Sequence, residues 1–450
     1  MQKILAGLQL RPAQSLAASF LVMILVGTVL LSLPISSATG QATSFVDALF
    51  TAVSAVCVTG LIVVDTPTHF SMFGQLVILF LIQLGGLGIM TFSTSLALAF
   101  GRRIGLREKV VMQDVLDQTD VEDTKRLVVY IVKMTFLIEL TGAVLLSIRW
   151  YPEFGDVGRT VYFAIFHSIS AFCNAGFSLF SDSFMGYRGD ITLNLILTSL
   201  IILGGIGFVV VADLHRSRFW MGRRSSTPRL ALHTKLVLSV TLILLVFGTA
   251  LFFLVEYNNS MNGTPIVERL LSSYFQSVTA RTAGFNTLDT RSLSHAALFV
   301  TVLLMFIGAS PGSTGGGIKT STIGVLYVFT RSIFRGKEEV ELFRRNVPRA
   351  VVYKAIVIVI FATSFLVALT IPLFITENAP FMDVIFEAVS AFGTVGLSLG
   401  LTSKLTDIGK VLIILLMFVG RIGPLTIAYA VGRRKERVAL GYPEGRVMVG

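Results

Sequence analysis

Four stretches of similar sequence decide how this chain folds: SAVCVTGL (54–61), SAFCNAGF (170–177), VTARTAGF (278–285) and SAFGTVGL (390–397). They align without gaps on Gly60, Gly176, Gly284 and Gly396, which lie 116, 108 and 112 residues apart. An aromatic residue stands ten positions before each of these glycines, and another glycine follows 24 to 28 positions after it. Repetition at matched offsets indicates four copies of one structural unit.

Each copy contains a short apolar stretch that lies between two long apolar runs. The short stretches, near 45–56, 161–172, 267–280 and 381–392, have about 12 residues, whereas a spanning helix needs roughly 20. They are therefore expected to be re-entrant helices that cross half of a membrane. The eight longer runs, which are predicted to span it, lie near 15–33, 73–100, 127–148, 192–214, 234–255, 296–330, 351–375 and 409–431.

The composition agrees with a polytopic membrane protein. Hydrophobic residues make up 54% of the 450 residues and charged residues 14%, against about 25% charged in an ordinary soluble domain. Cys57 and Cys173 are too few for a disulfide framework, and the five histidines form no HExxH pair. An enzyme is not expected, because no nucleophile and base stand out together among the serines, cysteines and histidines.

The net charge of +11 is attributed to topology rather than to nucleic-acid binding. Lysines and arginines concentrate at both ends of the chain and in the loops near 102–126, 216–235 and 331–349. By the positive-inside rule these segments face the cytoplasm, so both termini are predicted to be cytoplasmic. The four glycine loops then lie on the outer side. Part of the basic charge is expected to contact anionic membrane lipid.

The glycine loops are predicted to bind a cation through main-chain oxygens. Extended backbone at membrane depth is tolerated only inside protein or beside water. Four such stretches around one axis would offer rings of carbonyl groups in place of an ion's hydration shell. Glycine suits such loops because it adopts left-handed backbone angles at little steric cost. The alternative is that each loop is a glycine-terminated helix end packed against its neighbours.

The residue types at these loops favour a weakly hydrated monovalent cation, with potassium first, because none of them is a carboxylate. The predicted filter residues, which would hold K⁺, are Val58, Thr59, Gly60, Asn174, Ala175, Gly176, Thr282, Ala283, Gly284, Thr394, Val395 and Gly396.

Three charged residues near the loops are interpreted as braces rather than as ion ligands. Arg281 would repel a cation, so its side chain is expected to lie behind the loop, against a carboxylate or backbone carbonyls. Glu387, in the fourth short helix, is a possible acceptor in the same region. Glu139, in the third long run, is expected to join two helices.

The four glycine loops, together with IGASPGSTGGGIKTS (307–321) and GRIGPLT (420–426), resemble those of the Trk/Ktr/HKT superfamily of cation transporters, in particular the membrane subunits of Ktr-type bacterial potassium uptake systems. The resemblance covers essentially the whole chain. It implies an all-α polytopic fold of four fused M1–P–M2 repeats, with eight transmembrane helices and four re-entrant pore helices around one central pore. The expected repeats cover 1–101, 102–215, 216–332 and 333–450, the last with a cytoplasmic tail.

The glycine-rich segment 307–321 is predicted to be a gate. Its glycines and Pro311 cannot sustain a regular helix, and the resemblance assigns this position to a gating loop. Arg421 is an intramembrane charge, which by default suggests a functional site. It is expected to donate hydrogen bonds to carbonyls of 308–317 and to hold the gate closed. The alternative is a packing break between helices. The predicted gate residues are Gly308, Ser310, Gly312, Gly315, Gly316, Gly317, Lys319 and Arg421.

The predicted function is potassium uptake down the electrochemical gradient across the plasma membrane of a bacterium, without an organic cofactor. The resemblance implies a homodimer on a cytosolic ring of RCK-type nucleotide-binding regulatory subunits (KtrA- or KtrC-like), and stimulation by sodium in many members. A secondary transporter that couples potassium to Na⁺ or H⁺ is the alternative. Such folds tend to use inverted repeats and carboxylates at mid-membrane, whereas these four units run in the same direction.

Overall fold

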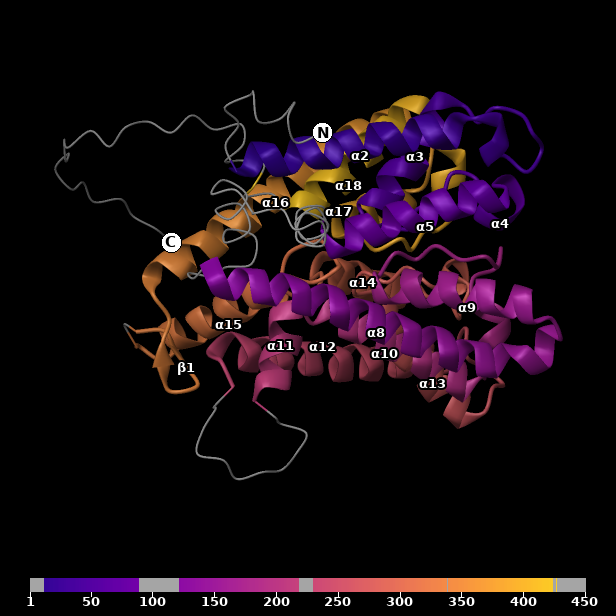
Figure 1. Ribbon diagram of the computed structural model, residues 1–450. Coiled ribbons are helices and arrows are strands. Elements are labelled where there is room, and N and C mark those ends of the chain that lie inside the picture. Colours follow the sequence, from indigo (N-terminus) through magenta and orange to yellow (C-terminus); the bar gives the residue numbers. More distant parts are fainter. Residues whose placement is uncertain (1–11, 89–120, 218–229, 338, 424–425, 427–450) are drawn as a thin grey trace.

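The computed structural model describes residues 12–88, 121–217, 230–337, 339–423 and 426. Their secondary structure is helical apart from a hairpin of two short strands, β1 (Glu341–Leu342) and β2 (Arg345–Asn346). Long helices lie side by side along one direction, with the β1–β2 hairpin at one end of the molecule and helix α4 (Thr66–His69) at the other (Figure 1).

Four helices are long and apolar enough to cross a membrane, and they match the first, third, fifth and seventh predicted spans. Side chains such as Leu242, Val246 and Ile360 are more than 60% exposed on these helices. Large exposed apolar surfaces on a spanning helix face lipid, so these helices form the outside of the molecule. They are α2 (Pro12–Ser32), α8 (Val121–Phe154), α12 (Leu232–Glu256) and α16 (Arg349–Thr376).

The short helices match the four predicted re-entrant stretches. They are α3 (Phe45–Val56), α9 (Val157–Phe172), α13 (Ile266–Thr279) and α17 (Phe381–Gly393). Ser44 and Asp156 cap the first two through hydrogen bonds to backbone N–H groups, and prolines precede the other two. Aromatic side chains ten residues before the glycines, including Phe50, Phe166 and Phe386, are fully buried. The short helices therefore form the centre of the core.

The second long run of each unit is not one continuous spanning helix in the described residues. These runs give α5 (Met72–Leu87), α10 (Ile191–Gly205) with α11 (Phe208–Arg216), α14 (His295–Phe306) with α15 (Thr320–Phe334), and α18 (Asp407–Ile422). The expected continuous helix over 192–214 is wrong: α10 and α11 meet at 95°. Gly207 adopts a φ of +96° there, and the N–H of Phe208 donates to Gly312 O at 2.8 Å instead of continuing the helix.

Several expected boundaries fall outside the described residues: the end of the 73–100 run, the repeat junction at 101/102, and the tail after 426. Short helical turns also connect the main helices. Besides α4 they are η1 (Pro34–Ser36), η2 (Met185–Tyr187), η4 (Thr290–Ser292) and η5 (Thr402–Lys404).

Helix packing follows one pattern around the molecule. Each long first helix packs on the short helix that follows it, as α2 does on α3 and α8 on α9. The second helix of each unit also packs on the short helix of the next unit, in the pairs α5–α9, α10–α13 and α14–α17, and α18 returns to α3. The chain therefore closes on itself, and the ends of all four short helices face a common centre.

Candidate ion-conduction site

The four loop glycines lie next to one another in a closed ring. A Cβ built on Gly60 would lie 3.0 Å from Gly176 Cα, and one on Gly176 would lie 3.1 Å from Gly284 Cα. A Cβ on Gly284 would lie 3.2 Å from Gly396 Cα, and one on Gly396 would lie 3.1 Å from Gly60 Cα. Side chains at these positions would overlap the neighbouring backbone, so only glycine fits without displacement. The predicted convergence of the four loops is present in the structure.

The loops share an unusual backbone. The φ angles of the ring glycines lie between +69° and +92°. The residue two positions earlier is also left-handed in every loop: Val58 at +57°, Asn174 at +59°, Thr282 at +75° and Thr394 at +50°. Left-handed angles are costly for non-glycine residues and persist where the surroundings enforce them, often at functional sites.

Carbonyl oxygens accompany each glycine. The oxygen of the residue before the glycine, in Thr59, Ala175, Ala283 and Val395, lies against the glycine of the adjacent loop. The four ring glycines, the four residues directly before them and the four left-handed residues two positions before them are the twelve predicted filter residues. All of those other than the glycines are fully buried, so the structure brings the whole predicted set together.

Hydroxyl groups that were not predicted from the sequence brace the loops. Ser54 Oγ donates to Leu61 O at 2.7 Å and accepts from Gly60 N, while Ser170 Oγ donates to Phe177 O at 2.7 Å. Ser390 Oγ accepts from Gly396 N at 3.2 Å. In the third loop the adjacent Thr279 donates to Phe285 O at 2.7 Å. The signal was available, since serine begins three of the four aligned motifs.

The second glycine series brings the later helices close to the short ones. Gly85, Gly204 and Gly420 pack so tightly that an added Cβ would overlap the carbonyl groups of Val56, Phe172 and Phe392 respectively. These carbonyls stand four residues before the ring glycines, at equivalent positions in the three units. Gly308 differs, because its neighbour is Gly316 of the segment that follows it.

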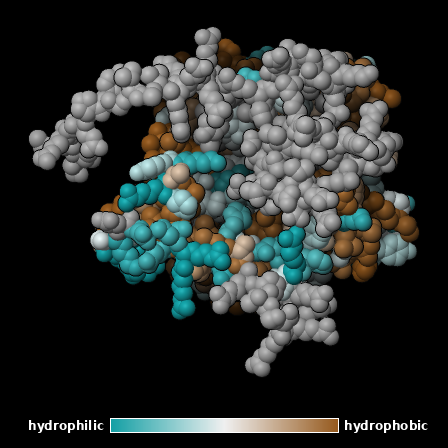
Figure 2. All heavy atoms as spheres, turned by 60° about the vertical axis from the view of Figure 1, so that its left-hand side comes forward, coloured by the Kyte–Doolittle hydropathy of each residue, from teal (hydrophilic) through white to brown (hydrophobic). Residues whose placement is uncertain are grey.

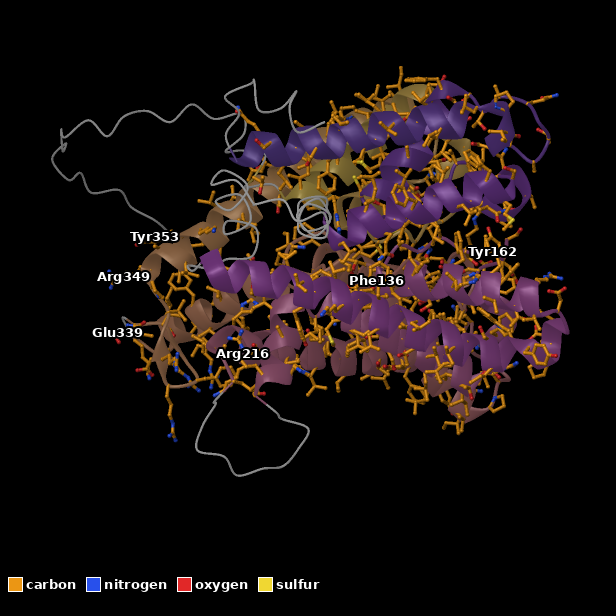
Figure 3. The ribbon with its side chains drawn as sticks, viewed as in Figure 1. Phe136, Tyr162, Arg216, Glu339, Arg349 and Tyr353 are labelled. Carbon is orange, nitrogen blue, oxygen red and sulfur yellow. The ribbon has the colours of Figure 1, made fainter. Side chains whose placement is uncertain are left out.

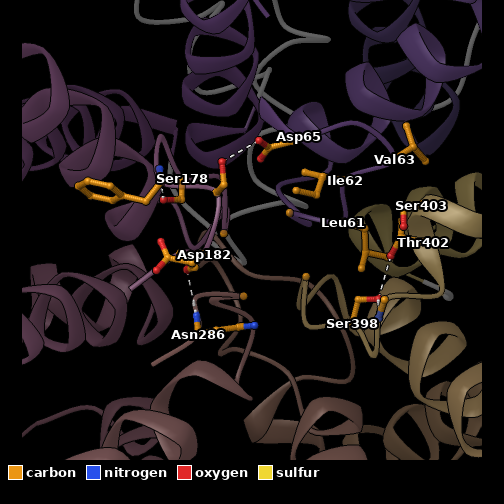
Figure 4. A pocket seen from close by; sticks show the side chains of 18 of the residues that line it. Leu61, Ile62, Val63, Asp65, Ser178, Asp182, Asn286, Ser398, Thr402 and Ser403 are labelled. Atoms are coloured by element: carbon orange, nitrogen blue, oxygen red, sulfur yellow. Dashed lines mark hydrogen bonds between the residues drawn. The ribbon is translucent and has the colours of Figure 1, made fainter. Parts of the chain in front are cut away.

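A cavity of about 370 Å³ opens above the ring on the side of the loop ends. All four ring glycines line it, together with Asp65, Ser178 and other side chains from the four loops, which face one another in Figure 4. On the rim of the cavity, Ser181 Oγ donates a hydrogen bond to Asp65 Oδ2 at 2.7 Å. The ring therefore has an entrance, lined by polar and apolar side chains, that every loop helps to form.

The segment between α14 and α15 lies against the other side of the loops. Gly316 N–H donates to Thr394 Oγ1 at 3.0 Å, and an added Cβ on Gly315 would overlap the Thr282 side chain. Ser310 N–H donates to Gly205 O at 3.0 Å. This non-helical segment is buried over Gly308–Ser310 and again over Thr314–Ile318. It contacts filter residues of two units directly.

Two basic side chains, Arg421 and Lys319, hold this segment, and the contact of Arg421 was predicted from the sequence. Arg421, at the end of α18, donates through Nη1 to Thr314 O and through Nη2 to Gly85 O. Lys319 Nζ donates to Gly315 O at 2.7 Å. Arg421 therefore joins the first unit, the fourth unit and the segment, whereas Lys319 closes the segment on itself. All eight predicted gate residues lie in or against this segment.

Arg281 departs in part from its prediction. The side chain is 8% exposed and lines a small cavity behind the third loop with Ile201, Leu245 and Ala309, among others. Its Nε has no hydrogen-bond partner among the described residues. The expected carboxylate or carbonyl acceptor for this atom is thus wrong, because the facing side chains from α10 and α12 are mainly apolar.

The two acidic residues act as braces, as interpreted. Gln83 Nε2 donates to Glu139 Oε2 at 3.2 Å, which joins α5 to α8. Glu387 accepts hydrogen bonds from Ser398 Oγ at 2.7 Å and from Thr402 Oγ1. His167 occupies the position equivalent to Glu387 in the second unit, and its Nε2 lies 3.1 Å from Ser178 Oγ. The contacts of His167 and Glu387 hold the segments that follow the ring glycines in the second and fourth units.

The comparison with protein families agrees with this architecture. A family model described as a cation transport protein, TrkH, matches residues 11–437, so the chain belongs to this family of membrane cation transporters. It is 45% identical over its whole length to the Ktr system potassium uptake protein B of Bacillus subtilis, of which it covers 99%. It is 40% identical to the potassium/sodium uptake protein NtpJ of Enterococcus hirae, over 98% of both chains.

The crystal structure of the potassium transporter TrkH from Vibrio parahaemolyticus has the same fold. The superposition gives a TM-score of 0.71 at 22% sequence identity and covers 92% of this chain and 85% of the other. The family model and the relatives confirm the predicted family. The chain is a multi-pass, helical membrane protein with a TrkH-like fold.

Proposed function

We propose that this chain is the pore-forming membrane subunit of a Ktr-type potassium uptake system. The observation that carries the proposal is the closed ring of Gly60, Gly176, Gly284 and Gly396, each beside a carbonyl group of its neighbour. Rings of backbone carbonyls replace the hydration shell of potassium in ion channels. The two relatives are named as potassium and potassium/sodium uptake proteins, which supports potassium as the transported ion.

The finer architecture belongs to the same proposal. Four fused M1–P–M2 repeats, with eight membrane crossings and four re-entrant helices, surround one pore. The cyclic packing of α5, α10, α14 and α18 on the short helices of the next units supports this arrangement. Both termini face the cytoplasm of a bacterial cell, as the distribution of lysine and arginine predicts. The subunit forms homodimers and docks on a cytosolic RCK-type ring, with sodium as an activator.

The segment 307–321 acts as the gate below the filter. It lies against Thr282 and Thr394, the residues two positions before two of the ring glycines. Glycine-rich backbone changes conformation at low cost, and Arg421 holds the segment in its present place. Movement of this segment away from the loops would open the path to the cytoplasm.

Potassium uptake in cells that lack their own potassium systems tests the filter. Each ring glycine is replaced by serine, and Gly186→Ser is the control. Gly186 is exposed, and a Cβ added to it would lie no nearer than 3.9 Å to another heavy atom. We expect the four filter variants to lose affinity or K⁺/Na⁺ discrimination, unequally but by about tenfold, which corresponds to roughly 1.4 kcal/mol. Normal uptake and discrimination in all four would reject the assignment.

A coupled symporter is the second candidate. It is supported by the name of the Enterococcus relative, a potassium/sodium uptake protein. Proteoliposomes separate the two mechanisms. Channel-like permeation predicts tracer uptake driven by a potassium gradient alone. A strict requirement for an inwardly directed sodium or proton gradient would favour the symporter instead.

A further inference from the structure

The hairpin β1–β2 has a strained tip. Its strands pair Glu341 with Asn346 and Leu342 with Arg345, which leaves a two-residue turn of Phe343 and Arg344. Both turn residues are left-handed, with φ of +49° and +64°, where hairpins usually place asparagine or glycine. Non-glycine residues in this region cost free energy and point to a function.

The base of the hairpin is firmly held. Val347 N–H donates to Val340 O at 2.8 Å. Val340 and Val347 are buried in one apolar cluster with Leu236 of α12 and Val325 of α15. The tip is therefore presented on a rigid support, beside the first turns of α12.

A cavity of about 280 Å³ lies between this tip and the start of α12. Three cationic side chains and three apolar ones line it, from the hairpin and from the segment that enters α12. They are Leu230, Leu232, Lys235, Phe343, Arg344 and Arg345.

The charge of this cavity is not neutralised by the acids nearest to it in the chain. Glu341 on β1 pairs with Lys337 at 2.7 Å, and Asp213 accepts the N–H of Ala231 at 3.0 Å. Neither carboxylate lines the cavity. Lys235 Nζ lies 6.0 Å from the centroid of the Phe343 ring. The carboxylate of Asp213 offsets the positive end of α12, so the positive charge of the cavity comes from Lys235, Arg344 and Arg345.

We propose that this cavity binds the phosphate group of an anionic phospholipid from the leaflet at the hairpin end. Position is the first argument: α12 is a spanning helix that begins at Leu232, so the cavity lies where headgroups meet acyl chains. Chemistry is the second. Arginine and lysine bind phosphate, basic pockets beside spanning helices take acidic headgroups, and the apolar half of the lining suits the start of an acyl chain.

Hydrophilic side chains gather on the end of the molecule that carries the hairpin (Figure 2). Arg216 and Arg349 lie at this same end (Figure 3) and are exposed, but they do not line the cavity. They allow a control with the same loss of charge at the same end of the molecule. The proposal does not depend on the filter, because no filter residue takes part.

Binding of purified full-length protein to phosphatidylglycerol in mixed micelles tests the site, read as the rise in Tm on lipid addition. The test variant is Arg344→Gln/Arg345→Gln, and the control is Arg216→Gln/Arg349→Gln. Each interfacial basic residue contributes about 1 kcal/mol to binding an anionic lipid, so we expect about fivefold weaker binding per removed charge in the test variant. We expect much less change in the control. Equal losses in both variants would overturn the site.

Measurements on the unmodified chain keep the test independent of variant folding. Phosphatidylglycerol must raise the Tm in a salt-dependent way, and phosphatidylcholine must not. A rise of the same size with inorganic phosphate alone would assign the cavity to a soluble anion and overturn the lipid source. Absence of any rise with phosphatidylglycerol would overturn the proposal. Uptake through the filter serves as a separate readout, so a failure of the proposed function is recognised by itself.

Discussion

Single residues set the local geometry of the pore loops. Only the glycine is identical in all four aligned stretches, yet each loop has a left-handed residue, then an ordinary one, then a left-handed glycine. Small hydroxyl groups at Ser54, Ser170, Thr279 and Ser390 fix this shape by bonding to the loop backbone. Backbone conformation, rather than side-chain identity, is therefore the property that the four loops share.

Arg421 offers the sharpest test at the scale of a residue. Its guanidinium donates to Thr314 O and Gly85 O, and each charge-assisted hydrogen bond contributes roughly 1.5 kcal/mol or more. Arg421→Ala should therefore release the segment and raise basal potassium flux about tenfold, measured in proteoliposomes without regulatory subunits.

Arg331→Ala is the control for this variant, because Arg331 is exposed near the end of α15. It removes one charge without touching the segment. An unchanged flux in a well-folded Arg421→Ala protein would count against the role of Arg421 as a latch.

At the scale of elements, the interrupted helix α14–α15 is the part that departs from its counterparts. In the other units the second helix packs through a glycine onto a short helix. In the third unit thirteen residues, 307–319, leave the helix and fill the space below the filter. Their backbone N–H groups donate to two other units, to Gly205 O of the second and to Thr394 Oγ1 and Gly420 O of the fourth. A contact set that spans several units suits a segment that blocks a shared path.

Gly316→Ala tests whether this segment obstructs the pore. The added Cβ would overlap the Thr394 side chain and lie 3.0 Å from Gly420 O. Since the filter is the more rigid partner, we expect the segment to move and basal flux to rise several-fold. Thr394→Ala should partly reverse the effect by making room.

Gly186→Ala serves as the control, because its added methyl group would lie no nearer than 3.9 Å to another heavy atom. A lower or unchanged flux in folded Gly316→Ala protein would contradict an obstructing role for the segment.

For the whole molecule, closure of the ring joins the first unit to the fourth. Lys410 of α18 contacts Asp47 of α3 at 2.7 Å, and both side chains are mostly buried. This ion pair connects the fourth unit to the first, 363 residues away in sequence. Such a contact stabilises the closed arrangement rather than any one unit.

Lys410→Met should lower the stability of the whole protein. Breaking a mostly buried, charge-assisted hydrogen bond costs about 1–2 kcal/mol, and for a chain of this size the Tm in detergent should fall by about 2 °C. Lys337→Met breaks an exposed pair with Glu341, at 2.7 Å, and should change the Tm less. Equal shifts would show that the contact with Asp47 has no special role in closure.

Much of this protein is determined by its sequence alone. Matched glycine series and the contrast between long and short apolar runs predicted the four short helices, the glycine ring and the buried segment, because periodicity and length reflect local physical constraints. The family followed from the same motifs. Local signals also explain why the four loops have one backbone shape.

Tertiary structure decided what depends on contacts between distant units. The 95° bend between α10 and α11 arises because Gly312, from another unit, accepts the hydrogen bond of Phe208 N–H. Arg281 Nε has no acceptor among the described residues because α10 and α12 bring mainly apolar side chains to it. The basic cavity exists only where the hairpin folds back on α12. None of these partners is near in sequence, so no local pattern specified them.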